Sequence, residues 1–428
     1  MRARVSQPRD AKTLIARWRE TVTGAGKLVQ GATRSYGDCH LSGFGKVVST
    51  VNLDAILAID PVSQIAIVES GVTFRQLHEH SMAHDLMAPV SPGTAFVTMG
   101  GAVANDVHGK NHVKDGSFGR HLVWLDLLLP SGEVRRLSPN RDGRLFWASV
   151  GGIGLTGVVL RLALKLQRVS GRAVIVRQTR VAGLEQMLAL LRSADDPYAV
   201  GWVDALAEGD AIGRGLFETA REVDQPFDDR SSRPVAVPFD MPGWLLSGHS
   251  VRAFNHLYRN RVPAEGCERL TSIRRFLYPL DALHQWNRIY GSRGFRQFQC
   301  VIPWSDASAA IARLLAEIAL AGNASFLAVI KALGQAGSGW LSFPKPGVTL
   351  ALDIPWRQTT DLLFRRLEAI TLEHGGRIYL AKDACLSAEG FRRMYPNARA
   401  FARLLDDIDP YRMIRSEMAS RLRIRDLT

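Results

Sequence analysis

The stretch "GGIGLTGVVLRLALKL", residues 151–166, decides which kind of fold this chain can adopt. Gly152, Gly154 and Gly157 match the GxGxxG pattern of dinucleotide-binding folds, in which a helix opens on the glycines and an acid follows about twenty residues later. Here the glycines run into alternating apolar and polar residues, which indicate a strand, and no acid lies between Asp142 and Glu185. The sequence therefore argues against a Rossmann fold.

The pattern of the sequence changes near residue 170, just after this stretch, and this change predicts two domains. Residues 25–170 are rich in glycine and in short strands, expected within 46–53, 64–72, 122–138 and 158–166. A helix is expected over 73–85, where Thr73 and Gln76 have the spacing of a capping box. From 172 to 385 a strand, a helix and a strand recur three times, which predicts one sheet with helices on one face. We place the domains at 1–170 and 171–385, with a helical segment over 386–428 that returns to the first domain.

Residues 223–265 are expected to be irregular, because prolines occur at 226, 234, 238, 242 and 263. An apolar "GWLL" lies inside this segment at 243–246. Such a long loop is commonly functional or disordered. The interpretation is a lid or a membrane-touching segment, with plain disorder as the alternative.

Composition describes a globular, strongly basic chain of 428 residues, 46% of them hydrophobic and 22% charged. A formal charge of +13 favours nucleic acid, phosphorylated small molecules or an acidic membrane surface as partners. The four cysteines form no CxxC pair, so we expect reduced thiols without a zinc ribbon or a disulfide framework. The amino terminus lacks the apolar region of a secretory signal, and no stretch is long and apolar enough to span a bilayer.

Two histidines four residues apart, His108 and His112, raise the possibility of a metal site on a helix. Gly109 argues against a helix there, and no acid lies between the two histidines to serve as a base. We therefore expect no metal, and the alternative is two loop histidines bonded to neighbouring groups. A GxSxG elbow and a Walker A lysine are both missing from the sequence, which disfavours the common hydrolases and nucleoside triphosphatases.

Glycine-rich turns with polar tips recur through the first domain. They read "GATRSYGD" (31–38), "SPGT" (91–94), "TMGGAVANDVHGKNH" (98–112), "GSFG" (116–119) and "GGIGLTG" (151–157). Backbone NH groups in such turns form nests for anions. Several nests along one cleft suit a long ligand with a pyrophosphate in its middle.

In this order the turns resemble the flavin-binding half of the vanillyl-alcohol-oxidase superfamily, in which FAD lies extended between two small α+β subdomains. The runs "FQCVIP" (298–303), "LSFPKPG" (341–347) and "GGRIYLAKDACLSAEGFRRMYP" (375–396) are similar to the decaprenylphosphoryl-β-D-ribose 2-oxidase family. The resemblance covers about residues 25 to 422. It implies an α+β fold, with a two-subdomain PCMH-type FAD-binding domain and a substrate domain whose antiparallel sheet is covered by helices.

That resemblance also implies an activity, which is FAD-dependent oxidation of the 2-hydroxyl of a polyprenyl-phosphoryl ribose to the 2-keto sugar. This step would be the first half of an epimerisation that gives the arabinose donor for cell-envelope polysaccharide. A short-chain dehydrogenase/reductase would complete the epimerisation. Two other classes stay open, namely a related oxidase of another alcohol or glycolipid and a non-enzymatic binder of nucleic acid or polysaccharide. The ordered glycine turns would have no purpose in such a binder, so we expect no nucleic-acid partner.

The resemblance carries over to individual residues. The catalytic candidates are Lys382, His108 and Tyr36. Substrate contacts are implied for Lys110, Trp202, Gln297, Gln299, Lys331 and Lys382, with Asn287 in addition. FAD contacts are implied for Gly31, Thr33, Arg34, Ser35, Tyr36, Gly37, Gly93, Thr94, Thr98, Gly100, Gly101, Asn105, His108, Gly109, Gly116, Ser117, Gly154, Val159 and Tyr379.

The residues alone support only part of these assignments. Strand alternation places Gln297 and Gln299 on one face, as a shared pocket requires. On spacing alone, Lys110 and Lys382 fit surface lysines equally well, and Tyr379 fits a core aromatic of a strand. We expect noncovalent FAD, because many relatives attach the flavin through a histidine at the place that Arg34 occupies here.

A cationic protein that acts on a prenyl phosphate would be drawn to an anionic bilayer by its charge. We therefore expect peripheral contact with the inner membrane. The missing signal favours the cytoplasmic face, while the periplasmic face stays open.

Overall fold

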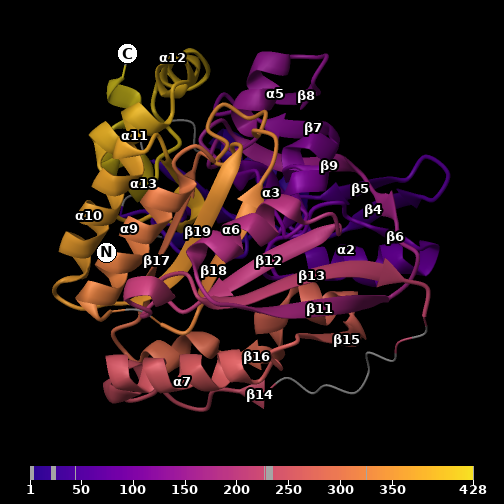
Figure 1. The fold of residues 1–428 in the computed structure, drawn as a ribbon. Helices are drawn as coiled ribbons and strands as arrows, with labels where there is room; N and C mark the ends of the chain where they lie inside the picture. The colour runs from indigo at the N-terminus through magenta and orange to yellow at the C-terminus, as the bar shows by residue number, and fades with distance from the viewer. Residues whose placement is uncertain are drawn as a thin grey trace.

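The structure is a computed structural model that describes residues 4–20, 26–43, 45–225, 227, 235–323 and 325–427. Helices and antiparallel sheets occur together in it, so the expected α+β fold is confirmed (Figure 1). No helix in the described ranges is long and apolar enough to cross a membrane.

Two small sheets form the framework of the first domain. A parallel sheet has the order β1-β3-β2, and an antiparallel sheet has the order β4-β5-β9-β7-β8. The strands are β1 (Arg4–Ser6), β2 (Lys27–Gln30), β3 (Lys46–Ser49), β4 (Ile56–Asp60), β5 (Ile65–Glu69), β7 (Leu122–Leu128), β8 (Val134–Leu137) and β9 (Val158–Lys165). The strands expected within 46–53, 64–72, 122–138 and 158–166 are all confirmed. β4 was not expected, because this edge strand is mostly exposed and shows no clean alternation of burial.

Short helices connect these strands. They are α1 (Ala11–Glu20), α2 (Phe74–Ser81), α3 (Met99–Asn105), α4 (His112–Asp115) and α5 (Gly143–Ser149). The capping box is confirmed, since Thr73 accepts from the backbone N–H of Gln76 and the Gln76 side chain accepts from that of Thr73. The run Gly151 to Gly157 is a turn with φ of +74° at Gly151 and +75° at Gly154, and it leads directly into β9. The expectation that these glycines open a strand is therefore confirmed.

The substrate domain is built on one eight-stranded sheet of order β15-β11-β13-β12-β18-β19-β17-β20, in which all neighbours are antiparallel. Its strands are β11 (Ala173–Val181), β12 (Tyr198–Val203), β13 (Gly215–Val223), β15 (Cys267–Ser272), β17 (Phe295–Ile302), β18 (Ala328–Leu333), β19 (Gly347–Pro355) and β20 (Arg377–Ile378). The helices α6 (Leu184–Ser193), α9 (Ala307–Ala321) and α10 (Thr360–Glu373) pack side by side, and Phe298 of β17 meets Phe364 of α10. The three predicted strand–helix–strand units are confirmed, whereas β13 and β15 were not expected.

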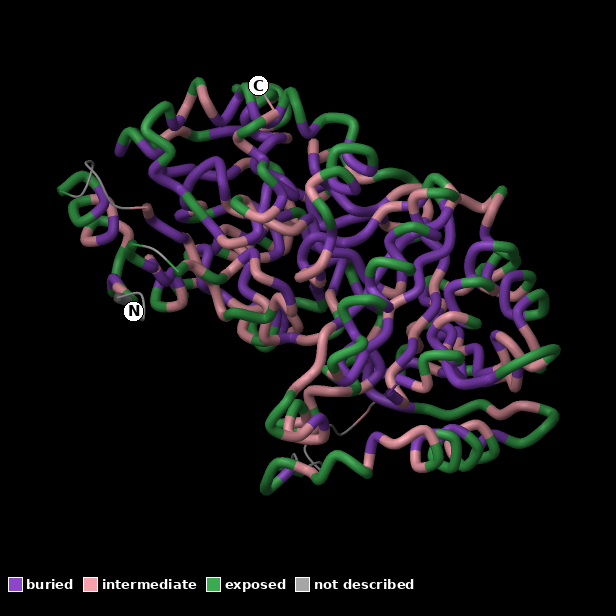
Figure 2. Tube along the Cα trace, turned by 90° about the vertical axis from the view of Figure 1, so that its left-hand side faces the viewer, coloured by how far each residue is buried: buried purple, intermediate pink, exposed green. Residues whose placement is uncertain are grey.

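The expectation of an irregular segment over 223–265 is wrong for much of its length. Residues 226 and 228–234 lie outside the described residues. Beyond them come β14 (Val235–Ala236), which pairs with β16 (Leu283–His284), the 3-10 helix η4 (Gly243–Leu246) and the helix α7 (Gly248–Asn260). The helix forms because Ser247 caps it by accepting from the N–H of Ser250, and because every proline of the segment lies outside it. Figure 2 shows buried chain inside the molecule and a largely exposed lower margin, where Figure 1 places α7.

The last segment packs back onto the first domain. Its helices are η7 (Leu380–Lys382), α11 (Ala388–Met394), α12 (Ala398–Ile408), α13 (Glu417–Arg421) and η8 (Ile424–Asp426). The backbone of Lys27 in β2 bonds to Met413 and Arg415. The Arg421 guanidinium bridges Asp38 of the first domain and Asp383, each at 2.8 Å. This bridge fixes the position of Asp383, the residue that follows Lys382 in the sequence.

Candidate active site

A cavity of about 1020 Å³ lies between the first domain and the open face of the eight-stranded sheet. This volume reaches the upper end of the range of about 300–1000 Å³ usual for ligand pockets. The glycine turns form one wall, and residues of β12, β17, β18 and β19 form the other. Most of the residues expected in the site line this cavity: Gly31, Thr33, Arg34, Ser35, Tyr36, Gly93, Thr94, Thr98, Gly100, Gly101, Asn105, His108, Gly109, Gly154, Val159, Tyr379, Lys110, Trp202, Asn287, Gln297, Gln299, Lys331 and Lys382.

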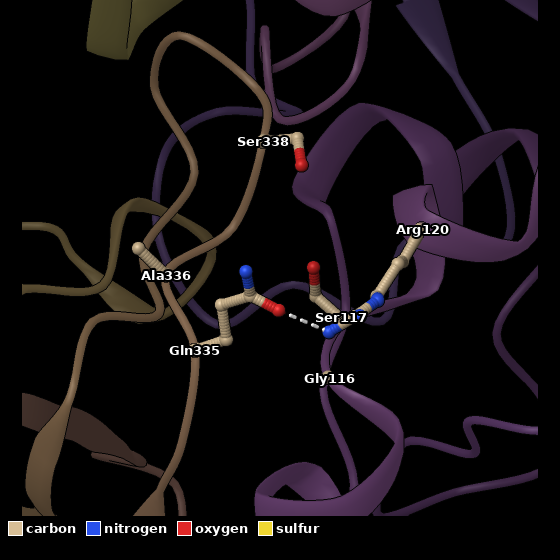
Figure 3. Close-up of a pocket in the computed structure, with 6 residues that line it drawn as sticks. All are labelled: Gly116, Ser117, Arg120, Gln335, Ala336 and Ser338. Carbon is tan, nitrogen blue, oxygen red and sulfur yellow. Dashed lines mark hydrogen bonds between the residues drawn. The ribbon is translucent and has the colours of Figure 1, made fainter.

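Three expected cofactor contacts lie outside this cavity. A Cβ at Gly37 would stand 1.6 Å from the carbonyl oxygen of Asp383, so close packing of two chain segments accounts for this glycine. Gly116 and Ser117 line a separate recess of about 260 Å³ (Figure 3). There the Ser117 hydroxyl donates to Asp106, and Arg120 bonds to Gln335 across the recess. These three residues shape the loops and do not face the main cavity.

The wall of glycine turns is shaped for a ligand to lie against it. Gly93 and Gly154 both line the cavity, and a Cβ added at either would meet no protein atom within 4 Å. Three buried polar atoms of this wall, Ser70 Oγ, Asn105 Oδ1 and His108 Nδ1, have no hydrogen-bond partner among the described residues. Because buried polar groups are almost always hydrogen-bonded, these atoms favour a polar ligand on this wall. An extended ligand such as FAD fits these residues.

His108 sits where the two walls meet. The Gln299 amide donates to His108 Nε2 at 3.0 Å, so the neutral ring carries its proton on Nδ1. Burial, followed by the charge of Lys331, holds the pKa of His108 well below its usual range. The ring lies 5.2 Å from Tyr379 and 5.3 Å from Phe343, measured between ring centres. His108 is therefore a fixed, uncharged donor whose Nδ1–H faces the cavity wall. The described residues contain no group of three or more metal-binding side chains.

Lys382 reaches the cavity from η7, directly after β20. Its Nζ lies 3.9 Å from the ring centre of Tyr36, which packs in turn against Phe295 and Trp286. Burial lowers the pKa of Lys382, while the carboxylate of Asp353 acts in the opposite direction. Burial raises the pKa of Tyr36, so its phenol keeps its proton at neutral pH. Lys382 is thus the side chain best suited to accept a proton at this wall.

Asp353 is a part of the site that sequence reasoning missed. It is fully buried in β19, where its carboxylate accepts from the Gln297 amide and, at 3.0 Å, from the Tyr290 hydroxyl. Burial raises its pKa, and attraction to Lys382 opposes that shift. A lone acid in the apolar strand "VTLALDIP" (348–355) was the available signal, since buried acids of this kind gather at functional sites.

Two further lysines, Lys110 and Lys331, line the cavity. Burial lowers the pKa of Lys110 and of Lys331 to about 8. The Lys110 ammonium donates to the carbonyl of Phe276 and lies 4.0 Å from the centre of that ring, so it is not a freely solvated lysine. Trp202 donates to the carbonyl of Phe326 at 2.7 Å. Cationic groups beside aromatic rings suit a phosphorylated ligand with an apolar part.

Comparison with known proteins agrees with this geometry. Residues 3–138 match the family model described as FAD binding domain, and residues 350–422 match that described as D-arabinono-1,4-lactone oxidase. Decaprenylphosphoryl-beta-D-ribose oxidase of Mycolicibacterium smegmatis is 34% identical over 94% of this chain and 90% of that protein. An uncharacterized protein of Streptomyces coelicolor is 32% identical over 82% of this chain and 100% of its own length. D-lactate dehydrogenase of Anaerostipes hadrus is 30% identical, over 29% of this chain and 27% of that protein.

Proposed function

The chain belongs to the decaprenylphosphoryl-β-D-ribose oxidase family and is an FAD-dependent oxidoreductase, and from this premise we propose that it oxidises the 2-hydroxyl of a polyprenyl-phosphoryl ribose to the 2-keto sugar. The observation that carries the proposal is the single cavity. It joins the glycine turns of the FAD-binding domain to a wall that bears Lys382 and to the lysines Lys110 and Lys331. The proposed proton acceptor and the two lysines proposed to bind the phosphate thus line the same cavity as the glycine turns.

We propose that FAD is held noncovalently along the glycine turns. Gly93 and Gly154 leave room for it, and His108 Nδ1–H and Asn105 Oδ1 provide a free donor and a free acceptor. Arg34 lines the cavity at the position where many relatives carry the linking histidine, and an arginine cannot form that bond. Bound FAD supplies the hydride acceptor for oxidation of an alcohol carbon.

The chain's own part in the reaction is to orient the sugar and to take its hydroxyl proton. Unprotonated Lys382 Nζ would accept that proton, and the Asp353 carboxylate would then stabilise the resulting ammonium group. Gln297 and Gln299 face the same cavity. The Gln297 amide is held by its bond to Asp353, and the Gln299 amide by its bond to Thr349. Tyr36 packs against the amine, and Trp286 and Phe295 pack in turn against Tyr36 and hold its ring in place.

The chemistry of the keto product and the lipid nature of the substrate suggest further partners. A 2-keto sugar needs a hydride-donating reductase to return it to the epimerised alcohol, and we propose a short-chain dehydrogenase/reductase for this step. Peripheral contact with the anionic inner membrane is proposed because the substrate is a membrane lipid and the chain carries a formal charge of +13.

The test of the proposed function is the visible spectrum of the purified protein before and after anaerobic addition of a polyprenyl-phosphoryl ribose. Flavin bands should be present and should bleach with this substrate, and acid precipitation should leave the flavin in the supernatant. Bands that do not bleach would contradict the proposed substrate. Flavin that stays with the precipitate would contradict noncovalent binding.

The pH dependence of catalysis tests the role of Asp353. If unprotonated Lys382 accepts the proton, kcat/KM rises with pH as Lys382 loses its own proton. The Asp353 carboxylate raises the pKa of Lys382, so Asp353→Asn should move this acidic limb to lower pH. The measurement is the pH profile of flavin reduction.

A matched control is Asp281→Asn, because Asp281 also lines the cavity but is not among the charges that act on Lys382. The acidic limb of the pH profile of Asp281→Asn should lie at the same pH as that of the unmodified protein. An Asp353→Asn limb that is unmoved, or that moves to higher pH, would contradict the assignment of Lys382 as the proton acceptor.

A further inference from the structure

The helix α7 has one face that packs on the substrate domain and one face with exposed apolar side chains. On the inner face Val251 is buried, and Asn255 donates to Asp204 at 2.6 Å. On the outer face, Phe254 is 41% exposed and Leu257 is 70% exposed. Their spacing of three residues places both on one side of the helix. This division of faces is typical of an amphipathic helix that lies on a surface.

Two further large apolar side chains are exposed in the segment just before α7. Trp244 in η4 is 69% exposed, and its carbonyl accepts from Ser250 in the first turn of α7. Phe239, 60% exposed, lies between β14 and η4 on the segment that bonds to 284–288. We call Phe239, Trp244, Phe254 and Leu257 the α7 face. Single exposed apolar residues are ordinary, but four large ones within a 19-residue stretch mark an interaction site.

The segment that carries the α7 face has more basic than acidic residues. Between residues 235 and 261, Arg252, Arg259 and Arg261 stand against one acid, Asp240. The side chains of Arg252 and Arg261 are each 44% exposed, although each has an acidic neighbour. Two copies of this face would bring like charges together, whereas an anionic lipid surface complements them. Trp and Phe beside Arg are the residue types that settle at the boundary between headgroups and acyl chains.

The α7 face continues into the cavity. Phe254 and Tyr258 of α7 line the cavity as well as the surface. Phe254 meets Phe326 with ring centres 5.0 Å apart, and Tyr258 meets Trp202 at 4.8 Å. An unbroken aromatic wall therefore runs from the exposed helix to the inside of the site.

From these observations we propose that the α7 face docks onto an anionic lipid bilayer, so that the mouth of the cavity opens onto the membrane surface. The docking itself stands on exposure and charge. Only the idea that a prenyl phosphate enters along the aromatic wall rests on the proposed function. Docking would let the phosphoryl headgroup of the prenyl substrate reach Lys110 while its prenyl chain stays against α7 and the lipid.

The experiment compares the unmodified protein with a Trp244→Ser/Leu257→Ser double variant in sedimentation with vesicles. The vesicles contain equal parts of phosphatidylglycerol and phosphatidylcholine, or phosphatidylcholine alone. Neither residue lines the cavity. The unmodified protein should bind the anionic vesicles and should be released by high salt. The double variant should bind these vesicles at least about tenfold more weakly.

The matched control is Leu320→Ser/Tyr411→Ser, which removes two equally exposed apolar side chains, 78% and 80% exposed, from other elements. This control should bind vesicles as the unmodified protein does. Docking through α7 would be overturned by equal binding of the Trp244→Ser/Leu257→Ser variant, by an equal loss in the control, or by failure of the unmodified protein to bind anionic vesicles. It would also be overturned if gel filtration found a dimer of the unmodified protein that only the α7 variant dissociates, since a second copy would then cover this face.

A soluble substrate separates this proposal from the proposed function. With phosphoryl ribose on a short, water-soluble prenyl chain, the α7 variant should reduce its flavin as fast as the unmodified protein. A slower reduction would place Trp244 or Leu257 in the site and would overturn a purely docking role. Failure of the unmodified protein to reduce its flavin with this substrate would count against the proposed function, while the vesicle result would still decide the docking.

Discussion

Replacing Lys382 by alanine lowers the rate of flavin reduction by substrate about 10²–10⁴-fold, which is the usual contribution of a positioned acid or base. The expected loss is large because the amine is the proposed proton acceptor and is held at the cavity wall, with Nζ 3.9 Å from the ring centre of Tyr36. The glycine turns that would hold FAD stay intact, and the variant should remain yellow. Stopped-flow absorbance of the anaerobic reduction measures the effect.

Two further variants serve as controls for this result. Lys382→Met keeps most of the side-chain length over Tyr36 but cannot accept a proton, and it should lose as much activity as Lys382→Ala. Lys12→Ala removes an exposed lysine of α1 and should leave the rate unchanged. A Lys382→Met protein with near-normal reduction would remove the amine from the mechanism.

Replacing Gly93 by leucine weakens FAD binding about tenfold to hundredfold. A Cβ at this position meets no protein atom within 4 Å, and the backbone φ is not positive, so the protein fold itself can accept the side chain. The leucine instead occupies space on the cavity wall where we place the cofactor. Overpacking of this kind costs about 1–3 kcal/mol, which sets the expected range. Flavin fluorescence in a titration of the apoprotein measures the affinity.

The control for Gly93 is Gly143→Leu at the start of α5. A Cβ at Gly143 also meets nothing within 4 Å, but Gly143 does not line the cavity. Both apoproteins should melt at the temperature of the unmodified apoprotein, and only Gly93→Leu should lose affinity. Equal FAD affinity of the two variants would contradict a cofactor path along the turn at 91–94.

Much of the architecture was accessible from local patterns in the sequence. The strand–helix–strand units of the substrate domain and the capped helix α2 follow from periodicity and from capping residues, which act over a few positions. The resemblance inferred from the glycine turns is confirmed by 34% identity over 94% of the chain. Most of the residues carried over by it line one cavity.

What escaped prediction depends on contacts between residues distant in sequence. Asp353 acquires its place through Gln297 and Tyr290, which are 56 and 63 residues away. Gly37 is explained by Asp383, which no local pattern connects to it. The helix α7 was missed for a different reason, because the prolines on both sides of it obscured a cap and an apolar spacing that were present.

The bridge made by Arg421 has a consequence for the order in which the protein is made. Arg421 joins Asp38, which lies 383 residues earlier, to the residue directly after Lys382. A ribosome builds the chain from the amino terminus, and domains generally fold as units during synthesis. The turn at 31–38 is also held by the C-terminal segment, because Arg421 binds Asp38 and the backbone of Tyr36 bonds to Ala381, so both walls of the cavity are fixed only after residue 421 has emerged. A nascent protein would thus complete the cofactor wall and the lysine wall together, once the segment around residue 421 has been made.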